Sequence, residues 1–433
     1  MVLDNKMRGA ESMGFGRSGL TLGGQVGVDA FAATAAADNA LCDQFYPYYA
    51  ELCALSEIRK KPGFGAEFRS GFGGHSLLYL SGVRRDQGAG YPTLKLCDPD
   101  TPPERCGVGI SVNSHYRNAN WVAAEGRDFV FRGLLAPDEP LTRAVYERTQ
   151  RHAKETGVLD GVEFHEALFR DKPAGMSKRE YMYDISVATD YAVRFGRDVY
   201  RARVPLDRTR MGLVVDFLNG LNAPYRGGAK QYRWRILNDN CSHVAHNALA
   251  VAGVWRPWPT GQFFAIAAFN FPVPKNELVD LVLRTNDLPI ENPDLVYGDV
   301  VARRLLLEHD ALPATPGALV QAERAIQDNA VYDTAKLRLI FYDNHFWGKY
   351  RGRFARIFGD PRYVDLRANL RHFQARHATA RQNRRAARPT ATGAERARFD
   401  AAYDRAITGA AAEVERHLAA LRAPAGARAE ALA

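Results

Sequence analysis

The stretch LNDNCSHVAHNALAVAG, residues 237–253, places a cysteine directly after Asp239-Asn240 and at the start of an alanine-rich run. Asn240 is a preferred residue for a helix N-cap, so Cys241 is expected at the first position of a helix. At 100° per residue, Cys241 shares one stripe with Ala245 and Ala248, which predicts close packing of this helix against another element. The sequence therefore predicts a thiol at the N-terminus of a closely packed helix.

Three interpretations of Cys241 stay open at this point: a nucleophile, a zinc ligand, or a small apolar residue in a buried helix. A zinc site would use His243 and His246, but Cys241 and His243 point to nearly opposite sides of a helix, and no further ligand pair occurs at metal-site spacing. Free cysteines are often buried for structural reasons alone. We expect no metal and no cofactor.

A nucleophile needs a base, and the best candidate is His75 in GFGGHSLLYLSG. On a strand, His75, Leu77 and Tyr79 share one face. In the next expected strand, GVGISVNSHY (107–116), apolar residues alternate with polar ones, and a polar group from that face can hold the far nitrogen of the imidazole and fix its tautomer. Asn113 and His115 are our candidates for this orienting role. The alternatives are a core histidine at position 75 and a polar cluster at the strand end.

These residues resemble the circularly permuted papain-like (NlpC-type) superfamily, which includes the lecithin retinol acyltransferase-like proteins. The resemblance rests on a strand beginning GHSLLYL and, much later, on NDNC at the start of a small-residue helix. Between them, YRARVPL, MGLVVDFLNGLN and YRWRILNDNC follow an order similar to that of the periplasmic thiol transacylase domain of bacterial lipoprotein remodelling. The resemblance covers roughly residues 65–255.

The resemblance implies that Cys241 is the nucleophile and His75 the base of an acyl-transfer reaction through an acyl-enzyme. The backbone N–H of Cys241, with Asn240 or Tyr232, would stabilise the oxyanion. The substrate would be a peptide, an amide or a lipid acyl group. The chain departs from the transacylases because its sequence shows neither a secretory signal nor a run of apolar residues long enough to span a membrane.

The pattern along the chain predicts an α+β fold in which a small antiparallel sheet packs on the cysteine-bearing helix. We expect a flexible leader (1–38), a permuted papain-like domain (39–275) with a helical insert (about 138–196), and a basic helical extension (276–433) with a partly disordered tail. Helices are expected over 38–61, 138–170, 177–196 and 209–222, and strands over 74–83, 107–116, 129–135, 197–206 and 232–237. After about residue 275 the sequence is almost wholly helical in pattern.

The net charge of +9 arises in the extension, because residues 341–433 hold 17 Arg and one Lys against nine acidic residues. Weak, non-specific binding of anionic surfaces is therefore expected there. The alternative to an enzyme is an inactive papain-like scaffold that binds nucleic acid or anionic lipid through these helices. Five cysteines, an odd number, argue against a disulfide framework. We accordingly expect Cys97 and Cys106 to be loop thiols and the protein to be cytoplasmic.

Overall fold

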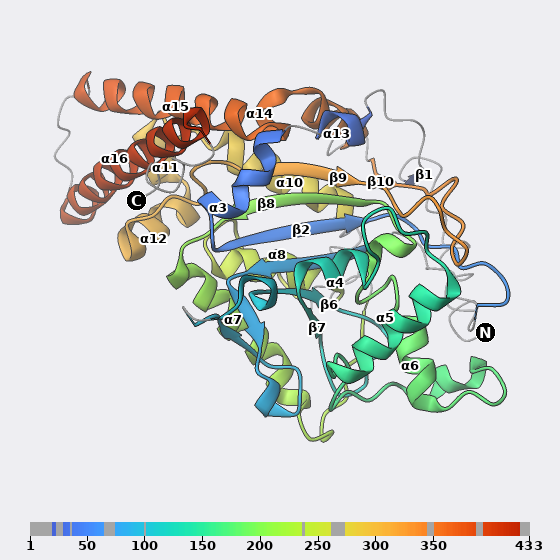
Figure 1. Cartoon of the computed structure of the whole chain (residues 1–433). Coiled ribbons are helices and arrows are strands. Elements are labelled where there is room, and N and C mark those ends of the chain that lie inside the picture. Colours follow the sequence, from blue (N-terminus) through green and yellow to red (C-terminus); the bar gives the residue numbers. More distant parts are fainter. Residues whose placement is uncertain are drawn as a thin grey trace.

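A six-stranded, wholly antiparallel sheet forms the centre of the computed structural model (Figure 1), with strand order β7-β6-β3-β2-β8-β9. The structure describes residues 20–22, 29–34, 37–64, 74–98, 101–235, 239–260, 273–343, 350–386 and 393–424. The strands are β2 (Tyr49–Leu55), β3 (His75–Ser81), β6 (Gly107–Ser111), β7 (Val122–Glu125), β8 (Val199–Pro205) and β9 (Leu319–Glu323). Helices cover this sheet, so the predicted α+β class with an antiparallel sheet is confirmed.

The two faces of the sheet are covered by different helices. Helix α8 (Cys241–Val251) packs on β3, and α10 (Pro274–Asp287) packs on β2 and β8, while α7 (Arg208–Asn222) packs against α8. On β3 the Ser76 hydroxyl contacts α8, whereas the Tyr79 ring contacts Phe131 of α4 (Arg127–Arg132). Because side chains alternate between faces along a strand, α8 and α4 lie on opposite faces.

The predicted helical insert contains two α-helices that are shorter than expected, α5 (Arg143–Glu155) and α6 (Lys178–Ser186), and the 3₁₀ segments η4 (Glu166–Asp171) and η5 (Val193–Phe195). The first helix ends early because Gly157 and Gly161 take positive φ angles of 65° and 73°. The second ends where Val187 is extended and Ala188 has φ 58°. The expected helices over 138–170 and 177–196 are therefore correct only in part.

The C-terminal region adds a second apolar cluster. Helices α15 (Leu366–Ala386) and α16 (Ala394–Arg422) lie side by side (Figure 1). Their buried residues pack with α11 (Pro293–Gly298), with α12 (Val300–His309), and with Leu41, Phe45 and Tyr46 from the beginning of the predicted catalytic domain. Helices α13 (Tyr350–Gly359) and α14 (Pro361–Val364) join the main core instead, which therefore crosses the predicted boundary at residue 275.

The remaining elements are short and lie outside the main sheet. Strand β1 (Leu20–Leu22) pairs with β10 (Ile340–Tyr342), and β4 (Val83–Arg85) pairs with β5 (Leu94–Leu96). The others are α2 (Ala30–Ala33), α3 (Cys42–Phe45), η1 (Ala37–Leu41), η2 (Gln87–Ala89), η3 (Pro103–Arg105) and η6 (Ala223–Tyr225). Most of the expected flexible leader (1–19, 23–28, 35–36), and residues 387–392 and 425–433 of the expected tail, fall outside the described residues.

Several sequence predictions of local structure are wrong. Residues 49–55, expected within a helix, form β2, whose seven residues are all buried, and a strand covered on both faces lacks the alternation that marks a strand in sequence. Residues 129–135, expected as a strand, contribute most of α4. The described part of the expected strand over 232–237 forms only an isolated bridge, Arg235 with Asp239. The expectation of helices after residue 275 misses β9, which pairs with β8.

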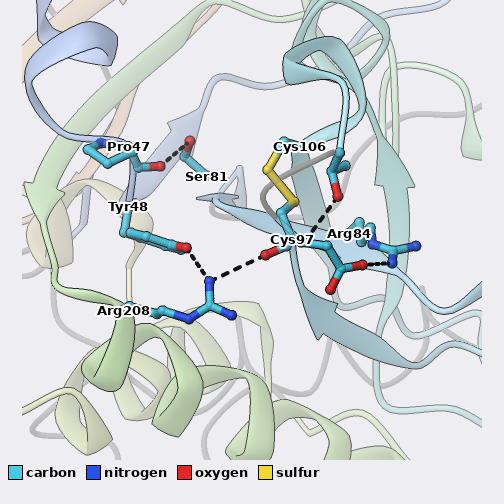
Figure 2. Close-up of a disulfide and its surroundings, with 9 residues drawn as sticks. Pro47, Tyr48, Ser81, Arg84, Cys97, Cys106 and Arg208 are labelled. Carbon is cyan, nitrogen blue, oxygen red and sulfur yellow. Dashed lines mark hydrogen bonds and ion pairs between the residues drawn. A yellow bond between two sulfur atoms is a disulfide. The ribbon is translucent and has the colours of Figure 1, made fainter.

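Cys97 and Cys106 form a disulfide, so the expectation of two loop thiols is wrong (Figure 2). The bond joins the chain after β5 to the residue that precedes β6. The Cys97 amide donates to the Gly82 carbonyl at 2.9 Å, and Arg208 of α7 donates to the Cys97 carbonyl at 3.3 Å. Disulfides persist in oxidising compartments. Because this bond is present, the odd number of cysteines no longer supports the expected reducing location. Within the described residues, no helix combines the length and apolar character needed to cross a membrane.

Close packing of β6 on α4 gives a test of the fold. A Cβ atom at Gly109 would lie 2.5 Å from Cγ1 of Val130, whereas a Cβ atom at Gly220 of α7 would meet nothing within 4 Å. We predict that Gly109→Ala lowers the free energy of unfolding by about 1–3 kcal/mol, because the short valine side chain has to shift. The matched control Gly220→Ala should raise it by roughly 0.5–1 kcal/mol, because alanine is the better helix former. Urea unfolding of both variants measures the difference, and equal stabilities would contradict the packing of β6 on α4.

Candidate active site

Cys241 lies at the first position of α8, as the sequence predicts, and the Oδ1 atom of Asn240 caps the helix. That oxygen accepts a hydrogen bond from the backbone N–H of His243 at 3.1 Å. Ala245 and Ala248 are buried, and these small side chains let α8 approach the sheet closely. The hydroxyls of Ser242 and Ser76 meet at 3.0 Å and join the beginning of the helix to the beginning of β3.

The thiol of Cys241 contacts the main chain of β3 beside His75. The backbone N–H of Ser76 donates to the Cys241 sulfur at 3.4 Å. Along β3, pairing with β6 begins at Leu77, which is opposite Ser111. Ser76 is the residue before Leu77, so β6 does not pair with it. The Ser76 nitrogen is two covalent bonds from Cα of His75, so the sulfur lies within roughly 6 Å of that atom. The main chain of His75 thus lies beside the thiol. The alternation that turns the Ser76 side chain toward α8 turns the His75 side chain, like that of Tyr79, toward the opposite face of the sheet, where it meets Ser111.

The His75 imidazole is held by a serine and an aspartate. Its Nε2 atom lies 3.0 Å from the Ser111 hydroxyl, which donates its proton to Oδ1 of Asp190 at 2.6 Å. A hydroxyl has one proton, so Ser111 can only accept from His75, and Nε2 must carry the imidazole proton. The tautomer therefore leaves a lone pair on Nδ1, the ring nitrogen nearer the main chain, and no described residue hydrogen-bonds to Nδ1.

Burial sets the charge state of these groups. Burial, assisted by Arg197, His115 and Lys275, lowers the pKa of His75 to about 3. Burial raises the pKa of the Cys241 thiol, although hydrogen bonds from Ser76 and from the start of α8 oppose this shift. The resting site at neutral pH therefore holds a neutral thiol and a neutral imidazole, and not a preformed ion pair.

Asp190 was missed by the sequence analysis, which assigned residues 177–196 to one helix. The residue lies between α6 and η5, is fully buried and shares a core with aromatic side chains such as Tyr191. Burial raises the pKa of Asp190, and Ser111 and other polar side chains around the carboxyl group oppose that shift. An aspartate inside the apolar run ATDYAVRF was the available signal, since a buried carboxyl group requires polar partners.

Asn113 and His115 do not take the orienting position expected for them. The hydrogen bond to the imidazole comes from Ser111, two residues before Asn113 on the same strand. The side chain of Asn113 accepts from the backbone N–H of His115 at 3.3 Å, and the His115 ring packs near Phe164. Burial lowers the pKa of His115 to about 4, so this histidine is neutral as well. The error has a physical reason, because β6 ends at Ser111 and the alternation of a strand stops there.

The two residues expected at the oxyanion are placed differently. Asn240 lies beside the thiol in sequence, but its side-chain oxygen is used by the helix cap and lies 3.1 Å from Nδ1 of His243. Tyr232 is fully buried, and its hydroxyl donates to the Asp239 carbonyl at 3.4 Å. The backbone N–H of Cys241, at the first turn of α8, is a further donor at this position.

His243 and His246 diverge along α8. The Nδ1 atom of His246 lies 2.7 Å from a carboxyl oxygen of Glu277, and its Nε2 atom lies 2.9 Å from the Arg256 carbonyl. The His246 ring stacks on Trp255 with a centroid distance of 4.0 Å. Among the described residues, no group of three or more His, Cys, Asp or Glu side chains is placed to hold a metal ion.

No protein-family model, no curated protein and no solved structure matches this chain.

The raised thiol pKa predicts the pH dependence of alkylation. We expect iodoacetamide to react with Cys241 at a rate that rises with pH to a midpoint above the ordinary thiol value of about 8.5, because burial disfavours the thiolate. Mass spectrometry of the modified peptide measures the rate, and Cys241→Ser provides the correction for Cys42 and Cys53. In urea the midpoint should return to about 8.5. A folded-state midpoint below 7 would indicate a thiolate–imidazolium pair and contradict the assignment of neutral groups.

Proposed function

We propose that the protein is a cysteine-dependent acyl-transfer enzyme with Cys241 as nucleophile and His75 as base. The observation that supports this most directly is the position of the thiol, against the Ser76 N–H at the start of the strand that bears His75. The Ser111–Asp190 pair adds to it, because it fixes the tautomer in which Nδ1 can accept a proton. The resemblance to the permuted papain-like superfamily agrees with a cysteine at a helix N-terminus packed on an antiparallel sheet.

In the reaction we propose, Nδ1 of His75 takes the thiol proton through a bound water at the start of β3, because the imidazole and the thiol lie on opposite faces of the strand. As the proton leaves, the sulfur attacks the carbonyl carbon of an amide or ester. The carbon–sulfur bond forms, and the carbonyl electrons move to the oxygen, where the backbone N–H of Cys241 is a suitable donor. The oxyanion then collapses, and the amine or alcohol leaves with the proton from His75. Water or an amine attacks the thioester in the second half, His75 removes its proton, and the thiol is restored.

Ser111 and Asp190 act through His75 in this proposal. The Nε2–H bond keeps the ring orientation during proton transfer, and the Asp190 carboxyl group stabilises the imidazolium that forms transiently. A pKa of about 3 means that the imidazolium is unstable in the resting site, so His75 passes the proton on to the leaving group and does not hold it. Peptide, amide and lipid acyl groups all satisfy this chemistry.

The alternative function, anion binding by a basic C-terminal region, is less well supported by the described helices. Many of the arginines there are paired with acidic groups, so less of the formal charge is available to an external anion. The pairs are Arg367–Asp38, Arg376–Glu291, Arg384–Asp404, Arg396–Asp294 and Arg405–Asp310. Weak binding at low salt remains our expectation for this region, and a cytoplasmic location likewise remains a prediction.

Acylation by a simple activated ester tests the proposal. We predict that p-nitrophenyl acetate releases p-nitrophenol in a burst and leaves an acetyl group on Cys241 that hydroxylamine removes, because the intermediate is a thioester. His75→Ala should slow the burst by about 10²-fold or more, as expected for loss of a general base. Ser111→Ala should slow it less, because it removes only the orientation of the ring.

Stopped-flow absorbance and intact mass measure the burst and the adduct. The matched control is His309→Ala on α12, which removes a histidine outside the site and should leave the burst unchanged. Full acylation of Cys241 in the His75→Ala variant would remove His75 from the mechanism, and absence of any adduct on Cys241 in the wild type would contradict the proposed function.

A further inference from the structure

A cavity of about 280 Å³ is bordered by helices α5 and α6, which lie side by side (Figure 1). None of the residues that line it belongs to the Cys241 site. One wall is a stripe of α5 side chains at spacings of three or four residues, which share one face of the helix. The residues of this stripe are Arg143, Tyr146, Glu147, Gln150 and Lys154. The other wall comes from α6, and Phe64 and Met176 add apolar groups.

The inner end of the cavity is a buried hydrogen-bond network in which the charges balance. Lys60 donates to the two carboxyl oxygens of Asp184, at 3.1 and 3.0 Å, and to the Tyr146 hydroxyl at 2.8 Å. The Tyr146 hydroxyl donates to Asp184 at 2.8 Å, and the Gln150 amide donates to the same carboxyl group at 3.2 Å. The side chains of Lys60 and Asp184 are almost completely buried, and their charges cancel. This end of the cavity is therefore polar, fixed in position and neutral.

The charged side chains nearer the opening are not paired. Arg143, Lys154, Glu147 and Glu180 bring two positive and two negative charges to the cavity. None of the four forms an ion pair within 4.0 Å with any residue that the structure describes. Charges of both signs thus surround one small space without neutralising each other directly.

Arg143 is held in place by groups other than a carboxylate. Its Nη2 atom donates to the Gly63 carbonyl at 2.8 Å, and its guanidinium group lies 4.4 Å from the centre of the Phe64 ring. Glu147 is one helical turn away, but a cation four residues before an anion is the less favourable order for a pair on a helix. The guanidinium group therefore keeps N–H donors for the carboxylate of a ligand, and Glu147 keeps both carboxyl oxygens for a ligand cation.

The second pair of opposite charges is less available to a ligand. Glu180 is the third residue of α6, and its carboxylate accepts a hydrogen bond from the Ser177 N–H at 2.9 Å in the capping box of that helix. Hydrogen bonds from Ser177, assisted by the charge of Lys154, lower the pKa of Glu180. This carboxylate therefore already serves the helix, and Arg143 with Glu147 is the pair that a ligand would complete.

The size and charge of the cavity limit the class of ligand. A volume of about 280 Å³ equals roughly nine water molecules at ~30 Å³ each, just below the range of roughly 300–1,000 Å³ for drug-sized ligands. A simple anion would face two carboxylates here, and a simple cation would face Arg143 and Lys154. A small zwitterion meets an opposite charge at each of its ends. The apolar surfaces of Phe64 and Met176 suit an apolar group on the same molecule.

We propose that this cavity binds a free α-amino acid with an apolar side chain. Its carboxylate pairs with Arg143, its ammonium group pairs with Glu147, and its side chain lies against Phe64 and Met176. The Gln150 amide gives its N–H to Asp184, so its carbonyl oxygen is the atom that it can offer to the ammonium group. The site is independent of the acyl transfer proposed for Cys241.

Isothermal titration calorimetry of the full-length protein with L-leucine and L-methionine tests the proposal. We expect both amino acids to bind. N-acetyl-L-leucine lacks the ammonium group and L-leucinamide lacks the carboxylate, so each should bind about tenfold more weakly or worse, because each loses one charged hydrogen-bonded pair. No binding of either amino acid at concentrations up to about 10 mM would overturn the proposal. An analogue that binds as tightly as leucine would also overturn it, since the site would then recognise only one of the two charges.

Two substitutions on α5 locate the binding site. Arg143→Gln and Glu147→Gln should each weaken the binding of L-leucine by about tenfold or more. The matched controls are Arg151→Gln and Glu155→Gln, which change exposed residues of the same helix that do not line the cavity and should leave binding unchanged. Binding that survives both cavity substitutions, or that falls equally in the controls, would place the amino acid elsewhere and contradict the assignment.

Discussion

The contact of the Cys241 sulfur with the Ser76 N–H is the constraint on which the site depends. It places the first turn of α8 against the start of β3, where β6 does not pair with β3. A helix with a larger residue at Ala245 or Ala248 would be held away from the strand. The small-residue stripe of α8 thus serves one geometric purpose, which is to place a thiol beside the main chain of His75.

Burial at this contact determines the chemistry that is available. An imidazole with a pKa of about 3 and a thiol with a raised pKa cannot form a stable ion pair, so in the proposed acyl transfer the proton would move as the sulfur attacks the carbonyl. The Ser111 hydroxyl commits the ring proton to Nε2, which leaves Nδ1 as the proton acceptor that the proposal requires.

The sequence predicted those parts of the fold whose signals are local. Strand β3, strand β8 and helices α7 and α8 begin and end near residues that punctuate a chain, such as Gly74 and Asn240. Strand β2 was missed because it is covered on both faces and so shows no alternation of polar and apolar residues. Helix α4 was missed because Phe129, Val130 and Phe131 are all buried, and three consecutive apolar residues show no helical periodicity. The edge strand β9 was also missed, because it has only five residues and the sequence after residue 275 is mostly helical in pattern.

The site shows the same division between local and non-local signals. Cys241 and His75 were selected from their own segments, and the need for a polar group on the next strand was inferred from its alternation. The identity of that group was wrong, because the end of β6 is fixed by tertiary pairing and not by its own sequence. Asp190, Arg197 and Lys275 escaped notice because each is far from Cys241 in sequence, and only the folded chain shows which charges are buried together.

The central claim is that His75 is neutral at rest with its proton on Nε2, and ¹⁵N NMR of protein labelled at histidine tests it most directly. The chemical shifts of the two ring nitrogens distinguish the tautomers and the imidazolium, and His75→Ala identifies the signal. We predict a protonated Nε2 and an unprotonated Nδ1, unchanged between pH 5 and pH 8, because burial holds the pKa of His75 at about 3. A proton on Nδ1, or a His75 signal that titrates near pH 6.5, would contradict the claim.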